Sequence, residues 1–272
     1  MKKPLKIVDT TLRDGEQCPG IIFSPENKVK LALALDKIGF YEIEVGIYDR
    51  KTEGREFLRE IMERRKNSKI SLWARLIPND VMEAAKQKPD LIHIAAPVSY
   101  VQIYSKLKKN KQWVEKALIQ CMEIADNFDV PITLGFEDCS RADTGFMIRL
   151  AYLAESLGVK TIRLADTVGI FTPTKAGKLI KELKSKTSLP IEAHEHNDFG
   201  MAVANSLEMA ILGAEFIDCT LFGIGERAGN CNLYDFVHAA EMRFDTGIEK
   251  RDILEVQKLF LQTVHKDVRS LL

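Results

Sequence analysis

The chain has 272 residues, which suits one large domain, since single barrels of alternating strands and helices run to about 250 residues. Lys and Arg together number 39, as do Asp and Glu, so the formal net charge is zero. This balance argues against a broad surface for nucleic acid or for a membrane, although it is compatible with a local basic pocket for an anionic substrate.

The start of the chain, MKKPLKIVDTTLRDG, lacks the roughly 7–15 apolar residues of an export signal. No run approaches the ~18 apolar residues of a membrane span. The five cysteines are scattered and include no C-x-x-C spacing, which is typical of reduced thiols. We therefore expect a cytoplasmic protein with neither a nucleic acid nor a membrane as its partner.

Short runs rich in Ile, Val or Leu recur along the chain, as expected of strands buried on both faces. In chain order they are 6–9, 42–46, 70–76, 91–95, 132–136, 161–165, 191–194 and 216–220. Amphipathic stretches between and after them predict helices at 25–38, 110–128, 144–157, 173–187, 200–212 and 251–272. Ser24 and Pro25 suit the start of the first helix, and Gly39 suits its end.

Strands that alternate with helices indicate a parallel sheet, and this length favours its closure. The sequence therefore predicts an α/β fold, a (β/α)₈ TIM barrel, as a single domain over residues 1–272. Neither G-x-G-x-x-G after the first strand nor G-x-x-x-x-G-K-[ST] is present, which disfavours the common nucleotide-binding folds.

In such a barrel the active site forms where the strands end. Directly after the first predicted strand, Arg13 and Asp14 are adjacent, and a glycine that allows a tight turn follows them. A carboxylate suits a hard divalent metal, and a guanidinium suits a developing enolate or a carboxylate. The alternative is a solvated loop with a surface ion pair.

The seventh predicted strand ends in His194-Glu-His196-Asn-Asp198. Residues i and i+2 of a strand point the same way, so both imidazoles can face the barrel mouth, at a recurrent metal-ligand spacing. A lone histidine is usually a core or surface residue, but two of only five at this spacing favour a metal. With Asp14 they form a mixed oxygen and nitrogen site, which suits Mg²⁺, Mn²⁺, Fe²⁺, Co²⁺ or Zn²⁺.

Other strand ends carry polar side chains that could anchor a substrate. Asn230 closes a glycine-rich loop after the eighth strand and could supply a further metal oxygen. Arg141, in the segment that begins at Glu137, could clamp a substrate carboxylate bidentately. Thr167 can donate a hydroxyl hydrogen bond. His93 is either a further anchor or a barrel-interior histidine with a backbone partner.

Two long motifs resemble a known family. DTTLRDGEQCPGIIFSPENK and EAHEHNDFGMAVANSLEMAILGAEFIDCTLFGIGERAGN look like the paired signatures of the acyltransferases that include homocitrate synthase, 2-isopropylmalate synthase and citramalate synthase. The resemblance covers essentially the whole chain. Residues 92–110 and 136–143 most resemble the nitrogenase-associated homocitrate synthases.

This resemblance implies a divalent metal as cofactor and acetyl-CoA as co-substrate. The implied metal ligands are Asp14, His194, His196 and, as a candidate fourth, Asn230. The implied catalytic side chains are Arg13, Gln17 and Glu44, and the substrate-binding side chains are His93, Glu137, Arg141 and Thr167. The enolate of acetyl-CoA attacks a 2-oxo acid, with 2-oxoglutarate giving homocitrate as the first choice, and thioester hydrolysis makes the condensation irreversible.

Family members commonly form dimers and continue beyond the barrel into a small region that contributes a histidine to the active site. This chain ends at Leu272, and His265 is not in the family's context for that residue. We therefore expect a homodimer, and either a separate C-terminal subunit or an altered activity.

Three alternatives stay open. A different 2-oxo acid (pyruvate, oxaloacetate or 2-oxoisovalerate) would give a citramalate, citrate or 2-isopropylmalate synthase. A carbon–carbon lyase of the hydroxymethylglutaryl-CoA type shares the barrel and the metal ligands, but its glycine-rich loop contains a cysteine, whereas Cys231 follows the loop here. A subunit that needs its C-terminal partner for activity is the third.

Overall fold

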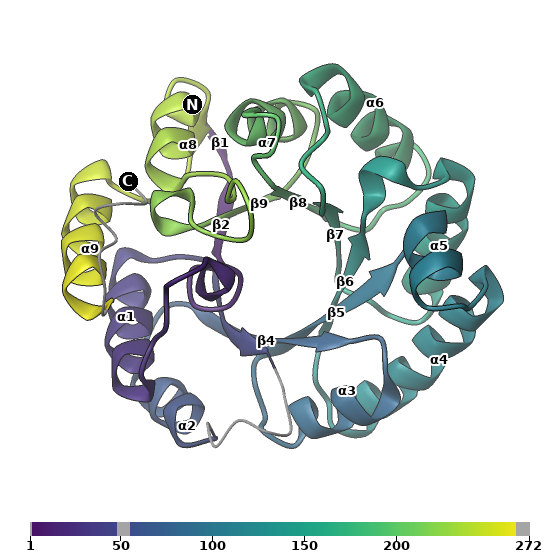
Figure 1. Cartoon of the computed structure of the whole chain (residues 1–272), viewed down its shortest axis with the longest axis horizontal. Helices are drawn as coiled ribbons and strands as arrows, with labels where there is room; N and C mark the ends of the chain where they lie inside the picture. Colours follow the sequence, from purple (N-terminus) through teal and green to yellow (C-terminus); the bar gives the residue numbers. More distant parts are fainter. Residues whose placement is uncertain (1, 48–54, 265–272) are drawn as a thin grey trace.

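A computed structural model of the chain describes residues 2–47 and 55–264. Its centre is a closed barrel of parallel strands, with helices around the outside (Figure 1). The barrel strands are Lys6–Asp9 (β2), Glu42–Ile47 (β3), Lys69–Arg75 (β4), Leu91–Pro97 (β5), Ile132–Glu137 (β6), Thr161–Asp166 (β7), Ile191–Glu195 (β8) and Phe216–Cys219 (β9). The predicted (β/α)₈ TIM barrel is therefore confirmed.

The helices of the described residues follow the barrel strands in chain order. They are Pro25–Ile38 (α1), Arg55–Arg64 (α2), Pro78–Ala85 (α3), Lys111–Asn127 (α4), Thr144–Ser156 (α5), Pro173–Lys184 (α6), Ala202–Ile211 (α7), Leu233–Ala240 (α8) and Lys250–Thr263 (α9). Sequence periodicity did not predict α2, α3 and α8. α3 and α8 have eight residues each, which is too few turns for a clear period, whereas α2 has ten, as the predicted α7 does, and was overlooked.

Shorter elements complete the chain. Within residues 2–47 and 55–264, three 3₁₀ turns, Gly15–Gln17 (η1), Cys139–Arg141 (η3) and Leu221–Gly223 (η4), and one π-helical turn, Val101–Lys106 (η2), lie in the loops that follow barrel strands. The two-residue strands Lys3–Pro4 (β1) and Phe244–Asp245 (β10) pair outside the barrel. The predicted helix at 251–272 is present as α9, and residues 265–272, with His265, lie outside the described residues.

The ends of α1 show why the sequence places the helix there. Ser24 lies in extended backbone before the helix, and its hydroxyl accepts the Asn27 amide at 3.2 Å. Pro25 then occupies the first turn, and Gly39 takes the left-handed conformation at φ 92° that ends the helix. No helix of the described residues is both long and apolar enough to cross a membrane.

Closure of the barrel brings the two ends of the sequence together. β2 pairs in parallel with β9 over four residues, from Lys6 beside Phe216 to Asp9 beside Cys219. The loop after β2 therefore lies next to the loops after β8 and β9, so side chains near residues 14, 194 and 230 can meet at one mouth.

Candidate active site

A cavity of about 400 Å³ lies at the end of the barrel where the strands finish. Most of the side chains predicted for the site line it: Arg13, Asp14, Gln17, His93, Glu137, Thr167, His194 and His196. Glu44, Arg141 and Asn230 are not among the residues that line it.

Asp14, His194 and His196 form the one metal-compatible group of this kind within the described ranges. One ligand atom from each lies within 4.8 Å of the others, and all three side chains are buried. The Nε2 atoms of the two histidines lie 3.8 and 3.9 Å from Asp14 Oδ2. Those separations are too long for hydrogen bonds, but one ion can span them with bonds of about 2.0–2.2 Å.

Two of the three side chains are in the charge states that bind a cation. Burial by itself raises the pKa of Asp14, but the charges of Arg13, His194 and His196 lower it to about 2. Burial, and then the charge of His194, lower the pKa of His196 to about 4. The carboxylate is therefore ionised and the His196 imidazole neutral near pH 7, which are the forms that bind metal. Burial lowers the pKa of His194, but Asp218 and Asp14 outweigh it and raise that pKa, so a metal competes with a proton for this ring.

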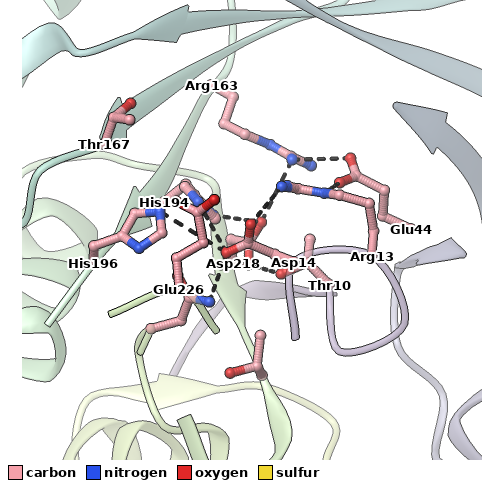
Figure 2. A network of polar contacts seen from close by, with 12 residues as sticks. Thr10, Arg13, Asp14, Glu44, Arg163, Thr167, His194, His196, Asp218 and Glu226 are labelled. Carbon is pink, nitrogen blue, oxygen red and sulfur yellow. Dashed lines mark hydrogen bonds and ion pairs between the residues drawn. The ribbon is translucent and has the colours of Figure 1, made fainter. Parts of the chain in front are cut away.

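Asp218, which sequence reasoning missed, orients His194. Its Oδ2 lies 3.0 Å from His194 Nδ1, so the other ring nitrogen, Nε2, faces Asp14. Its Oδ1 accepts the Thr10 hydroxyl at 2.6 Å (Figure 2). Carboxylates that hold a metal-binding histidine in this way are common. An acidic residue within an otherwise apolar strand, Phe216–Cys219, was the signal in the sequence.

Asn230 was predicted to offer an oxygen to the metal, but its side chain adopts a rotamer that turns the amide nitrogen toward Asp14. Its amide nitrogen donates to Asp14 Oδ2 at 2.6 Å and to the Ile224 carbonyl at 2.9 Å. In this rotamer Asn230 positions the Asp14 carboxylate and does not offer an oxygen to a metal. Its Oδ1 is buried and has no partner among the described residues. Rotation of the amide would break both hydrogen bonds and turn Oδ1 toward two acceptors, Asp14 Oδ2 and the Ile224 carbonyl, so an Asn230 oxygen ligand would require the cation itself to compensate.

Glu44 lies beneath Arg13. Its Oε1 accepts Arg13 Nε, while Arg13 Nη1 donates to Asp14 at 2.7 Å. Its Oε2 accepts Arg163 Nη1 at 2.9 Å. Burial alone raises the pKa of Glu44, but the two arginines bring it well below its usual value. Glu44 is therefore an ionised anchor that holds Arg13 toward the cavity, as Figure 2 shows.

His93 Nδ1 faces both a donor and an acceptor. Arg163 Nη1 lies 2.7 Å from it, and Glu44 Oε2 lies 2.9 Å from it. Since a guanidinium can only donate and a carboxylate only accept, each contact favours a different tautomer of the ring. Burial, and then the charge of Arg163, lower the pKa of His93 to about 3, so the ring is neutral. A Cβ at Gly135 would lie 2.3 Å from Nε2, so only glycine leaves room for this ring.

Glu137 and Thr167 form a linked pair on the cavity wall. The Thr167 hydroxyl donates to Glu137 Oε2 at 3.2 Å and accepts the Asp138 amide at 2.8 Å. Burial raises the pKa of Glu137, although His194 and Arg13 oppose the shift. The pair gives the cavity a polar wall on the β6–β7 side.

Arg141 is directed elsewhere. Its Nε and Nη2 donate to the two carboxylate oxygens of Asp138 at 2.8 and 2.7 Å. Asp138 itself takes a left-handed conformation at φ 64°. Arg141 therefore stabilises the turn after β6. Its guanidinium is not among the groups that line the cavity, where it would have to lie in order to bind a substrate carboxylate.

The fold and these strand-end side chains define a barrel enzyme with a carboxylate–imidazole–imidazole centre at its mouth. The HMGL-like family matches residues 4–260, and the chain belongs to this family. Homocitrate synthase subunit alpha of Clostridium pasteurianum is 42% identical over 86% of this chain and 87% of that protein. The predicted membership of the acyltransferase family of homocitrate and 2-isopropylmalate synthases is thereby confirmed.

Other relatives in the same group are longer. 2-Isopropylmalate synthase 2 of Caldanaerobacter subterraneus is 37% identical over 94% of this chain and 67% of its own length. The (R)-citramalate synthase CimA of Methanocaldococcus jannaschii is 35% identical, and this chain spans 52% of it. Among solved structures, hydroxymethylglutaryl-CoA lyase from Pseudomonas aeruginosa superposes with a TM-score of 0.88 over 98% of this chain and 95% of that chain. At 18% identity, that likeness shows the fold alone.

Proposed function

We propose that this chain condenses acetyl-CoA with a 2-oxo acid, with 2-oxoglutarate as the acid and homocitrate as the product. The observation that carries the proposal is the buried Asp14–His194–His196 group, with the Arg13 guanidinium fixed against Asp14 at the same cavity. The 42% identical homocitrate synthase subunit supports 2-oxoglutarate over the other acids.

The three metal ligands would hold a divalent ion, which supplies Lewis-acid polarisation of the keto group. Arg13 contributes the neighbouring positive charge. Its Nε and one Nη1 hydrogen are engaged by Glu44 and Asp14, so Nη2 stays available to an oxygen in the cavity. Preorganised donors of this kind stabilise developing negative charge in a site from which water is excluded. Burial disfavours the charged guanidinium, but Glu44 and Asp14 outweigh it and raise the pKa of Arg13, which stays charged.

The inner wall of the cavity fits a second acidic group on the substrate. The neutral His93 ring lines this wall, and its Nε2 has no hydrogen-bond partner among the described residues; in the tautomer protonated at Nε2 it would donate to a carboxylate oxygen. Glu137 and Thr167 then limit the length of acid that the cavity accepts. Arg141 would need to leave Asp138 before it could share this role.

Release of free CoA thiol by the purified chain tests the proposal. The assay contains Mg²⁺ or Mn²⁺, acetyl-CoA and, one at a time, 2-oxoglutarate, pyruvate, oxaloacetate and 2-oxoisovalerate. We expect turnover with 2-oxoglutarate and loss of turnover with EDTA. Turnover restricted to another acid would keep the condensation and overturn the substrate. Cleavage of hydroxymethylglutaryl-CoA, without condensation of any acid, would instead assign a lyase.

We also propose that the chain works as a homodimer and together with a separate subunit. The name "subunit alpha" of the Clostridium pasteurianum relative supports a second subunit, because this chain matches 87% of that protein. Light scattering of the purified chain measures its own oligomeric state. An inactive, metal-loaded chain that gains turnover when a co-expressed second chain is added would support the subunit.

A further inference from the structure

The segment between β5 and α4 forms the outer wall of the active-site cavity. Gln102, Lys106, Leu107 and Trp113 line the same cavity as the candidate metal ligands. Two unusual backbone features shape the segment: the π-helical turn Val101–Lys106, and a left-handed Lys108 at φ 56°. Such conformations are rare for ordinary residues, and they cluster at functional sites.

This wall is positively charged. Lysine occupies positions 106, 108, 109 and 111 of the sequence Lys-Leu-Lys-Lys-Asn-Lys. Lys111 lies 3.7 Å from Asp143, whereas Lys106, Lys108 and Lys109 are exposed and form no ion pair within residues 2–47 and 55–264. The arginines of the described residues that line the cavity already have acidic partners, since Arg13 contacts Asp14 and Glu44, and Arg75 pairs with Asp80 at 2.6 Å. An anion at the cavity mouth is therefore drawn to the lysine segment.

Apolar side chains also line this cavity. Ile47, Ile77, Leu107 and Trp113 line it together with Lys106. The cavity thus combines a catalytic end, an apolar stretch and a cationic rim. A ligand that matches this order has a reactive group, a long weakly polar arm and an anionic tail.

We propose that the segment Lys106–Lys109 binds the phosphates of coenzyme A, while the pantetheine arm lies along Leu107, Ile77 and Trp113 and delivers the acyl group to Arg13. The inference rests on the proposed function, and it specifies the side of the barrel mouth from which acetyl-CoA enters the cavity. The 2-oxo acid then occupies the deeper part of the cavity between the metal ligands and His93.

The test compares two double variants of the full chain. Lys106→Gln with Lys109→Gln removes the proposed phosphate contacts, and Lys175→Gln with Lys178→Gln removes two exposed lysines of α6 that do not line the cavity. We expect the first variant to raise KM for acetyl-CoA roughly tenfold with kcat unchanged, because exposed charge pairs each contribute a few-fold. KM for the 2-oxo acid, and KM for acetyl-S-N-acetylcysteamine, which has no phosphate, should stay as in the wild type.

Calorimetric titration with CoA itself, without turnover, separates this inference from the proposed function. A CoA dissociation constant that rises in the Lys106/Lys109 variant, and not in the α6 variant, supports the inference even when no acid turns over. Turnover together with an unchanged KM for acetyl-CoA overturns the inference and leaves the synthase standing. A raised KM for the 2-oxo acid alone would assign the lysines to that substrate and overturn the inference equally.

Discussion

Arg163 is a charged side chain with no exposed surface, held in the middle of the barrel by acidic side chains. It lies 2.9 Å from Glu44, 2.7 Å from Glu192 and 3.6 Å from Asp218. Through Glu44 it supports Arg13, and its Nη1 also contacts His93 Nδ1 at 2.7 Å. A buried ion pair adds little net stability, but removal of one member leaves its partners uncompensated.

Arg163→Met should therefore lower the free energy of unfolding by about 3–5 kcal/mol. The matched control is Arg149→Met, since Arg149 pairs with Glu115 at 2.7 Å on the surface and should contribute about 0–1 kcal/mol. Urea unfolding of both variants at pH 7 gives the two values. Equal losses would contradict the assignment of Arg163 as the centre of a buried network.

Asp218 makes a prediction about metal affinity. Asp218→Asn keeps the size of the side chain but removes the charge beside His194 Nδ1, and second-sphere changes of this kind typically reduce metal affinity about 10–100-fold. Titration of the metal-free chain with Co²⁺, followed by visible absorption, measures the change. In the same titration, His194→Ala should no longer bind Co²⁺. An unaltered metal affinity in Asp218→Asn would contradict the role of Asp218 in orienting His194.

At the scale of elements, the glycine-rich loop between β9 and α8 determines the position of the Asn230 side chain. A Cβ at Gly225 would lie 2.1 Å from Asn230 Nδ2, and a Cβ at Gly229 would lie 2.0 Å from the Gly223 carbonyl oxygen. The glycines therefore let the backbone approach closely, and Asn230 reaches Asp14 across the seam where the barrel closes.

Gly225→Ala should displace Asn230 and lower metal affinity at least about tenfold while the fold is retained, since the clash lies in a loop and not in the core. Gly46→Ala is the control, because among the described residues an added Cβ there would meet Phe57 alone, at 3.8 Å. Circular dichroism checks the fold, and the Co²⁺ titration checks the site. Equal metal affinity in both variants would show that the loop does not position Asn230.

At the scale of the whole molecule, the barrel interior contains more acids than bases. Glu42 and Glu192 face Arg163 below the site, and Glu44 and Asp218 face it as well. Burial raises the pKa of Glu42 to about 7, although Arg163 opposes the shift. Burial raises the pKa of Glu192 well above its usual value. The folded barrel therefore retains protons that the unfolded chain releases.

This excess predicts how stability depends on pH. Between about pH 4.5 and pH 7 the folded state binds more protons at Glu42 than the unfolded state, so the Glu42 contribution to the free energy of unfolding falls as pH rises through that window. His93 and His196 oppose it, because their lowered pKa values give contributions that rise with pH. Glu42→Gln should therefore make the slope more positive than in the wild type, whereas Glu123→Gln on the exposed face of α4 should leave it unchanged. Urea unfolding at pH 5, 6, 7 and 8 in EDTA measures the slope. The same slope in Glu42→Gln and in the wild type would contradict a protonated Glu42.

The sequence by itself determined the barrel, and it predicted the Asp14, His194 and His196 side chains that the barrel brings together. Strand runs such as 132–136 and helices such as Pro25–Ile38 are local patterns, since a buried parallel strand is a short apolar run and a helix start carries its own cap. The alternation of side chains along a strand was enough to place His194 and His196 on one face.

Only the tertiary structure decided which polar side chains meet. Asp218 and Arg163 lie inside strands, where the sequence does not reveal their partners, and those partners lie up to 208 residues away, as between Asp218 and Thr10. Arg141 looked free to bind a carboxylate, but the turn after β6 supplies Asp138 as its nearer partner. Closure of β2 against β9 joins Asp14 to Asn230 across 216 residues, because only a closed barrel brings its first and last strands into contact.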